Sequence, residues 1–484
     1  MKTKLIVSIA ILAILMITLL PMTTRAASTP NIVTAKMKNG YSVEPAKVEA
    51  YTNNDPLPAS VTPFNLDMVN AEQVTETGKG IYVAVLDTGL LSNYRYFFPK
   101  GVVNIKTEWG IGFTHDIFYV GTGGNFSEDG MFSYGPLRSD RGFITHDDGA
   151  PDQWGLGWGS GHGTQVTSEI TGWYLNRSGV QYWVKGVAPK VTIIPVLVLD
   201  DWVGWTPSGD GYFYAGGTDE MVAAGIRYIG DLAAKYHIKI VINMSLGGSS
   251  PTQMEENAID YAISKGVIIV ASAGNEGTAG MGWPGAYPQV ISVAACGWTQ
   301  EYLRYYLGTA NPWYWWTDNV PENLWTTDPL GNPFQVYLTD FSSRPNAALG
   351  QHIWDLDVAA PGAGIKGPFK DYGPDQWGYY SVWGTSQAAP HVAAIAALVL
   401  QDFPNLNQFA MEAVLKTAGL FNPLTKPCEN SRSAVVFDIF SGTLVTYTWT
   451  WKDYGTGLVQ VDTALMVARL LFGKVKCPIG PIAH

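Results

Sequence analysis

The chain has 484 residues, of which 46% are hydrophobic, so it can bury a large core. Its 41 acidic residues outnumber its 30 lysines and arginines, which gives a net charge of −11, and no basic cluster interrupts this excess. Because binding of nucleic acid depends on patches of Lys and Arg, we predict no nucleic-acid partner.

The N-terminal segment, residues 1–27, has the features of a cleaved export signal. Lys2 and Lys4 precede an apolar run from residue 5 to residue 20, and Arg25-Ala26-Ala27 offers a cleavage site of small residues. The apolar run is short for a bilayer span of about 20 residues, so we predict cleavage and a secreted protein. The alternative is an outward-facing protein that this segment, left uncleaved, anchors in the membrane.

The first strong strand signal ends in a carboxylate, and an imidazole follows farther along the chain. The β-rich apolar run Ile81–Leu86 is typical of a strand buried on both faces, and Asp87 comes directly after it. His162 stands at a predicted helix start between Gly161 and Gly163, which allow other groups to approach the ring closely. We therefore take Asp87 and His162 as a candidate acid and base.

Strands and helices alternate in the rest of the chain. The predicted strands are 191–199, 238–244 and 267–271, and the predicted helices are 218–236, 255–264 and 386–400. This alternation predicts an α/β fold with a mostly parallel central sheet and helices on both faces. In such sheets functional groups gather beyond the carboxyl ends of the strands, where Asp87, Asn275 and the segment 245–248 all lie.

An asparagine and a serine complete the candidate site. Asn275 follows a buried strand, and its amide can donate to a carbonyl oxygen that is becoming an alkoxide. Ser386 stands at the mouth of an Ala-rich helix, where unpaired N–H groups and the helix dipole favour negative charge. Serine is a weak nucleophile alone and needs the base and acid named above. Taken singly, each residue is more commonly a turn former or an N-cap, but their joint occurrence favours an enzyme.

Three aromatic stretches interrupt this frame, near residues 90–158, 200–217 and 298–337. One interpretation is that they are loops whose rings bury one another. The other is that the first two wall a cleft and restrict substrates to unfolded or narrow peptides.

The three cysteines allow one disulfide in an exported protein. Cys296 follows an apolar run and is predicted to be a buried thiol. Of the three possible pairings we favour Cys428–Cys477, since both residues lie in the C-terminal part of the chain.

These motifs together resemble the subtilisin-like serine proteases, the subtilase family. The matching segments are VAVLDTG around Asp87, GHGT around His162, INMSLGG and VASAGNEG between them and the serine, and GTSQAAPHVAA around Ser386. A closing segment, YGTGLVQVDTALMVA, is also similar, and the resemblance spans roughly residues 58–472. The order Asp, His, Ser along the chain is that of subtilisin.

The resemblance implies a three-layer subtilisin-like fold in residues 58–484 and a secreted serine endopeptidase. Ser386 would be the nucleophile that forms the acyl-enzyme, His162 the general base, and Asp87 the group that orients the imidazole. Asn275 and the Ser386 N–H would bind the oxyanion, and the chemistry would require no cofactor.

The resemblance also implies residues that contact the substrate. Ser245, Leu246 and Gly247 resemble the family strand that pairs with an extended polypeptide substrate through main-chain hydrogen bonds. Ala273 and Gly274 resemble a wall of the pocket for the side chain before the cut.

The chain departs from the family pattern at its N-terminal end. Family members commonly carry a folded pro-domain after the signal, but residues 28–57 are too few for one. We therefore expect either folding without a pro-domain or a short leader.

Structural calcium and glycans are further expectations. Residues 175–180 resemble a shortened family calcium loop, and acidic residues such as Asp147, Asp148 and Asp152 could supply oxygen ligands instead. Asn125 and Asn176 each begin an Asn-X-Ser sequon and are candidate glycosylation sites.

Two other functions compete with the peptidase. One is a catalytically silent surface protein that uses its aromatic loops for binding, although the four candidate catalytic residues argue against it. The other is a relative of the sedolisins, which replace the histidine base with glutamate, and His162 argues against that assignment.

Overall fold

The computed structural model describes residues 32–34, 39–45, 59–119, 132–145, 161–177, 180–205, 211–303, 320–321, 323–370 and 377–473. The predicted export signal, most of the predicted leader and parts of all three aromatic stretches lie outside these ranges. The other expectations are compared with the described residues below.

A nine-stranded sheet forms the centre of the molecule. In order across the sheet its main path is β18 (Val336–Leu338), β17 (Ile291–Trp298), β16 (Ile268–Ser272), β14 (Ile240–Met244), β4 (Tyr82–Asp87), β11 (Thr192–Leu197) and β5 (Asn104–Ile105), while β19 (Val358–Pro361) pairs with β17 and β6 (Ile111–Gly112) with β11. All neighbours pair in parallel except β17 and β18, which are antiparallel. The predicted α/β class with a mostly parallel sheet is therefore confirmed.

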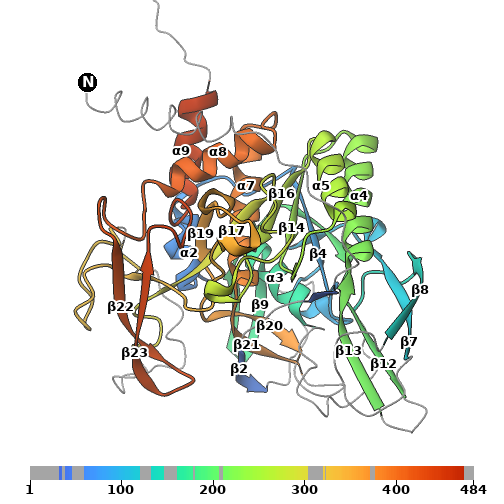
Figure 1. Cartoon of the computed structure of the whole chain (residues 1–484), viewed down its shortest axis with the longest axis horizontal. Coiled ribbons are helices and arrows are strands. Elements are labelled where there is room, and N and C mark those ends of the chain that lie inside the picture. Colours follow the sequence, from blue (N-terminus) through green and yellow to red (C-terminus); the bar gives the residue numbers. More distant parts are fainter. Residues whose placement is uncertain are drawn as a thin grey trace, which may run out of the picture.

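Helices cover this sheet to give three layers (Figure 1). They are α2 (Phe64–Met68), α3 (His162–Thr171), α4 (Asp219–Tyr236), α5 (Gln253–Ser264), α7 (Thr385–Asp402), α8 (Gln408–Gly419) and α9 (Val461–Phe472). Short 3-10 helices are η1 (Ala71–Gln73), η2 (Tyr94–Tyr96), η3 (Thr107–Trp109), η4 (Gly277–Ala279), η5 (Ala347–Leu349) and η6 (Ile353–Asp355). Helices α4 and α5 pack on each other, whereas α7 packs on α3 and on the central strands.

Smaller sheets lie around the central layer. They are the hairpins β7 (Thr114–Tyr119)–β8 (Phe132–Arg138) and β22 (Ser431–Asp438)–β23 (Thr443–Thr450), the sheet β3 (Ser60–Val61)–β10 (Val180–Lys185)–β9 (Gly172–Arg177), the sheet β12 (Asp200–Trp205)–β13 (Gly211–Thr218)–β1 (Ile32–Thr34)–β15 (Gly247–Gly248), and the sheet β2 (Asn39–Pro45)–β21 (Trp377–Trp383)–β20 (Ile365–Lys370). The hairpins β22–β23 and β12–β13 project from opposite sides of the view in Figure 1.

Helix α7 runs through the core, because Ala and aliphatic residues surround its axis on every side. Its residues from Thr385 to Leu400 are all buried. A helix this apolar could suggest a membrane segment, but none of the helices among the described residues meets the length and apolarity that a bilayer crossing needs.

Candidate active site

Asp87 and His162 meet in the interior of the protein. Asp87 ends β4 and His162 begins α3, and both side chains are 0% exposed. The imidazole Nδ1 lies 2.8 Å from Oδ1 and 3.0 Å from Oδ2 of the carboxylate. Since a carboxylate accepts hydrogen bonds, we assign the proton to Nδ1, which leaves the lone pair of the neutral ring on Nε2. That Nε2 is buried and has no hydrogen-bond partner among the described residues.

Residues next to this pair hold the two elements in register. The Gly163 N–H donates to Oγ1 of Thr88 at 3.0 Å, and the Leu91 N–H donates to Oγ1 of Thr164 at 2.9 Å. The Thr88 N–H donates to Oδ1 of Asp87 at 2.7 Å, which orients the carboxylate toward the ring. The hydroxyls of these two threonines were not singled out from the sequence, although Thr88 lies within the VAVLDTG segment and Thr164 within GHGT.

Ser386 lies in the first turn of α7, after Gly384. Its hydroxyl donates to the carbonyl oxygen of Ser245 at 3.0 Å, and the Ser245 hydroxyl donates to the carbonyl oxygen of Ser386 at 2.7 Å. These reciprocal bonds tie the start of α7 to the end of β14. No hydrogen bond joins Ser386 to His162 in this conformation. The structure therefore joins two of the three expected side chains, and the third link requires the serine hydroxyl to turn away from Ser245.

Asn275 lies just beyond the end of β16 and is bound to the residue before Ser386. Its Oδ1 accepts from the backbone N–H and from the hydroxyl of Thr385, both at 2.9 Å. Because both donors approach the oxygen, the NH₂ end of the amide points away from Thr385. The amide group of Asn275 is thus oriented by the same turn that carries Ser386.

Ala273 and Gly274 connect β16 to this turn. The Gly274 N–H donates to Oγ1 of Thr385 at 3.1 Å, and the Ser343 N–H donates to the carbonyl oxygen of Gly274 at 2.9 Å. Gly274 has φ +105°, a conformation that L side chains rarely adopt. The Ala273 carbonyl accepts from the Gly282 N–H at 2.9 Å.

The predicted substrate strand is paired with the chain's own N-terminal part. Ser245 and Leu246 follow β14, and Gly247 is in β15. β15 pairs antiparallel with β1, with Thr34 opposite Gly247, and β1 pairs on its other side with β13 of the second aromatic stretch. Farther along, β2 pairs antiparallel with β21, the strand that ends at Trp383. Segments within residues 32–45 thus pair with β15, which follows Ser245 and Leu246, and with β21, which leads into the Ser386 turn.

A buried polar cluster lies between α3 and α7. His391, which the sequence gives no glycine neighbours, contacts the Gln387 carbonyl through Nδ1 at 2.7 Å and Asn65 Nδ2 through Nε2 at 2.8 Å. Burial lowers the pKa of His391 to about 4 and raises the pKa of Glu169, 3.5 Å away, well above its usual value. With a pKa of about 4, the His391 ring is neutral at pH 7, so that Nδ1 donates to the Gln387 carbonyl and Nε2 accepts from Asn65.

The cysteine and metal expectations are only partly covered by the described residues. Cys296 is buried in β17, and burial raises the pKa of its thiol, as expected for a structural cysteine. Cys428 is exposed, and its predicted partner Cys477 lies outside the described residues. Among the described residues no group of three or more His, Cys, Asp or Glu side chains could hold a metal ion. Asp147, Asp148 and Asp152 lie outside them.

One of the two sequons and most of the calcium-like segment lie among the described residues. Asn125 lies outside the described residues, and Asn176 is only 3% exposed in β9, which disfavours a glycan there. Residues 175–177 and 180 belong to the antiparallel pair β9–β10, with Asn176 opposite Gln181.

Comparisons with known proteins identify the family of the chain. The family profile described as Subtilase family matches residues 78–436. A subtilisin from Bacillus sp. (strain TA39) is 29% identical over 364 residues, and the match covers 73% of this chain and 65% of the relative. Fervidolysin from Fervidobacterium pennivorans is 31% identical over 317 residues, which are 64% of this chain and 35% of that protein. The chain thus spans less than two thirds of the length of these two relatives.

A solved structure titled S41 Psychrophilic Protease superimposes with a TM-score of 0.50 at 26% identity and covers 84% of this chain and 100% of its own. The profile match includes the Asp87, His162 and Ser386 segments and all nine strands of the central sheet. The described residues beyond 436 lie outside it. The chain belongs to the subtilase family.

Proposed function

We propose that the protein is a serine endopeptidase that hydrolyses peptide bonds through an acyl-enzyme. The observation that carries the proposal is the Asp87–His162 contact, with a buried Nε2 that has no partner among the described residues, at the start of a helix that packs on the helix bearing Ser386. Ser386 Oγ attacks the scissile carbonyl while Nε2 takes its proton, and Asp87 stabilises the imidazolium. The C–N bond then breaks as His162 returns the proton to the leaving amine. Water repeats the two transfers and releases the acid.

Asn275 and the Ser386 N–H would stabilise the tetrahedral intermediate. The Thr385 contacts support this role, because they fix the amide before the reaction and so avoid the cost of reorientation. The Ser386 backbone N–H lies in the first turn of α7, where N–H groups have no partner within the helix and the helix dipole is positive.

Extended polypeptides are the substrates that this site would accept. The Gly247 edge of β15 is suited to pairing with an added strand, and β1 already pairs there. Ser245 and Leu246 would continue this contact toward the scissile bond, and Ala273 with Gly274 would border the pocket before it.

Residues 28–57 would act as a short leader. β1 and β2 supply main-chain partners for β15 and β21, the same edges that an extended substrate needs. A leader bound in this way competes with substrate until it is removed. Export by residues 1–27, a Cys428–Cys477 disulfide and a structural calcium ion belong to the same proposal.

The direct test replaces the nucleophile. Ser386→Ala should reduce kcat on denatured casein by about 10⁶-fold, the loss known for the nucleophile of subtilisin itself. Ser264→Ala, at the exposed end of α5, is the matched control and should keep the activity. Absence of cleavage by the parent protein would favour a silent binder, and activity confined to strong acid would favour a carboxylate base in place of His162.

A further inference from the structure

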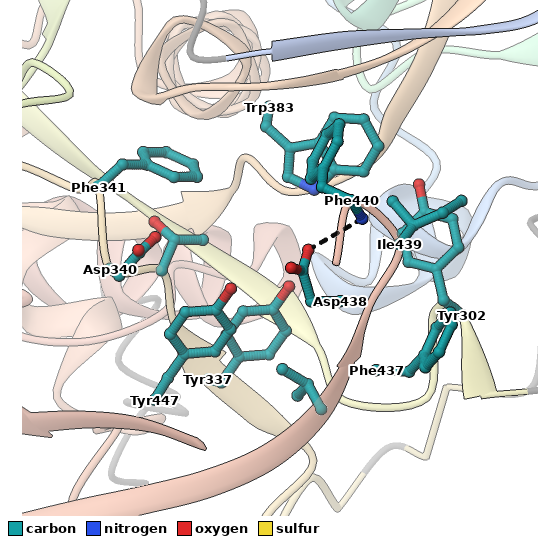
Figure 2. Close-up of a pocket in the computed structure, with 12 residues that line it drawn as sticks. Tyr302, Tyr337, Asp340, Phe341, Trp383, Phe437, Asp438, Ile439, Phe440 and Tyr447 are labelled. Atoms are coloured by element: carbon teal, nitrogen blue, oxygen red, sulfur yellow. Dashed lines mark hydrogen bonds between the residues drawn. The ribbon is translucent and has the colours of Figure 1, made fainter. Parts of the chain in front are cut away.

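A cavity of about 180 Å³ opens beside the strand that leads to Ser386 (Figure 2). It lies between the β22–β23 hairpin, the segment that follows β18 and the end of β21. Trp383 is the last residue of β21 and lines the cavity, and Gly384 alone separates it from α7. The cavity is therefore close in the chain to the candidate nucleophile, yet none of the proposed catalytic residues lines it.

Aromatic rings form most of its wall. The Trp383 ring stacks on Tyr302 with 5.8 Å between the centroids, and Phe440 meets it edge to face at 4.7 Å. Tyr337 and Tyr447 stack on each other at 5.3 Å, and Figure 2 shows their hydroxyls on the same side as the Asp438 carboxylate. The faces of such rings attract cations.

Two carboxylates add negative charge to this wall. Asp438 accepts from the N–H groups of Phe440 at 3.2 Å and Ser441 at 3.1 Å, so the hairpin turn holds its side chain in place. Asp340 lines the cavity from the segment after β18. Neither Lys nor Arg is among the described residues that line it.

A buried lysine that contacts this wall is already paired with a carboxylate. Lys366 contacts the Tyr302 hydroxyl at 3.0 Å from behind the wall, but it is paired at 3.1 Å with buried Glu301. That pair is neutral as a unit, so it does not offset the charge that Asp438 brings to the wall.

Strand pairing indicates where a bound polypeptide would run relative to the cavity. Asn39 of β2 lies opposite Trp383, so an extended chain paired with β21 runs along its rim. Strand β1, which pairs with β15, precedes strand β2, which pairs with β21, in the chain. A substrate bound in the same direction would therefore have its leaving-group side along β21. The cavity is smaller than the pockets of about 300–1,000 Å³ that hold drug-sized ligands, and a single side chain suits it better.

We propose that this cavity binds the cationic side chain of an Arg or Lys residue on the leaving-group side of the scissile bond. The proposal rests on the endopeptidase function above. The aromatic wall would contact the cation, and Asp438 with Asp340 would accept its hydrogen bonds.

The test uses internally quenched peptides that carry arginine, lysine or norleucine at each position after the cut in turn. Norleucine matches the length of the lysine side chain without its charge. At one position kcat/KM should be about tenfold higher for the cationic residues, as expected for a hydrogen bond to a charged group. Asp438→Asn should remove this preference and leave the norleucine peptide unchanged, whereas Asp438→Glu should retain part of it. Equal rates for lysine and norleucine at every position would overturn the proposal.

Two controls separate the possible failures. Asp231→Asn, an exposed acid of α4, should leave the preference intact, and Asp340→Asn tests the cavity if the Asp438 variants do not fold. In the Ser386→Ala protein, calorimetry with N-acetyl-arginine amide should show saturable binding that Asp438→Asn weakens about tenfold. Such binding without cleavage by the parent would refute the peptidase function alone. No binding, or equally tight binding of free n-butylamine, would refute a site for peptide side chains.

Discussion

The contact between Asp87 and His162 depends on the lack of a side chain at Gly163. A Cβ added to Gly163 would lie 2.3 Å from the Gly89 carbonyl oxygen and 3.2 Å from the Asp87 Cβ. The glycine that follows the candidate base is therefore required by the close approach of α3 to the end of β4.

We expect Gly163→Ala to lower kcat by about 100-fold, because the methyl group must displace α3 and a shift of about 1 Å has this effect on an aligned site. The measurement is kcat on a quenched peptide together with the thermal midpoint. Gly247→Ala is the matched control for stability, since the nearest atom to its added Cβ would be the Trp283 carbonyl oxygen at 3.7 Å. A variant that loses stability but keeps full kcat would contradict this role of Gly163.

Asn275 offers a substitution that separates two roles of one side chain. Asn275→Ala should lower kcat by about 10²–10³, the loss known for the oxyanion asparagine of subtilisin itself. Asn275→Asp keeps an oxygen for Thr385 but removes the NH₂ donor, so it should lose activity to a similar extent. If the aspartate variant were as active as the parent, positioning of Thr385 would be the sole role of the residue.

At the scale of elements, periodicity and strand composition predicted the central layer well. The predicted helix 218–236 is α4, and the strands predicted at 238–244 and 267–271 are β14 and β16 with ends moved by up to two residues. These segments are predictable because their burial on the sheet leaves a local pattern of apolar residues.

The β22–β23 hairpin was not predicted. Only one face of β22 is well buried, and β23 is largely exposed, so its apolar signal is weak. The aromatic cavity could not be predicted either, because it joins Trp383, Tyr337 and Phe440 from segments far apart in the chain. The pairing of β1, a strand of only three residues, with β15 also joins segments far apart in the chain.

Helix α5 carries a carboxyl group that should make stability depend on pH. Burial, with the charge of Asp219, raises the pKa of Glu255 from 4.5 to about 8. Between these values the folded protein holds a proton that the unfolded chain has released, so the free energy of unfolding falls as pH rises through this window. Above about pH 8 this contribution is constant.

Glu255→Gln should remove that slope and raise the thermal midpoint most at pH 8 and above. The comparison is made in the Ser386→Ala background, which prevents self-digestion, at intervals from pH 4 to 9. Glu256→Gln, the less buried neighbour in the same turn, is the matched control. Parallel curves for the parent and Glu255→Gln would show that the buried carboxyl does not titrate in this window.

At the scale of the whole molecule, the N-terminal segments connect regions that are otherwise distant. β1 lies between the β12–β13 hairpin and β15, and β2 borders β21. The sequence suggested only that residues 28–57 are too short for a folded pro-domain, since strand pairing by so few residues leaves no periodic pattern.

A protein that begins at residue 46 should therefore cleave a quenched peptide at a higher initial rate than one that begins at residue 28. The reason is that β15 and β21 no longer have an intramolecular partner. A synthetic peptide of residues 28–45 should inhibit the shorter protein competitively, and a peptide of the same composition in scrambled order should not. Equal rates and no inhibition would exclude occupancy of these edges in solution.

The burial of α7 has a consequence for how the protein should lose its proposed activity on heating. Its Ala-rich body fills the interior from Thr385 to Leu400, and its first turn presents the serine hydroxyl. Because the same helix forms part of the core and carries Ser386, unfolding of the core should also displace the candidate nucleophile. Heat inactivation and collapse of the tertiary structure should then share a single midpoint, without a damaged but still active species between them.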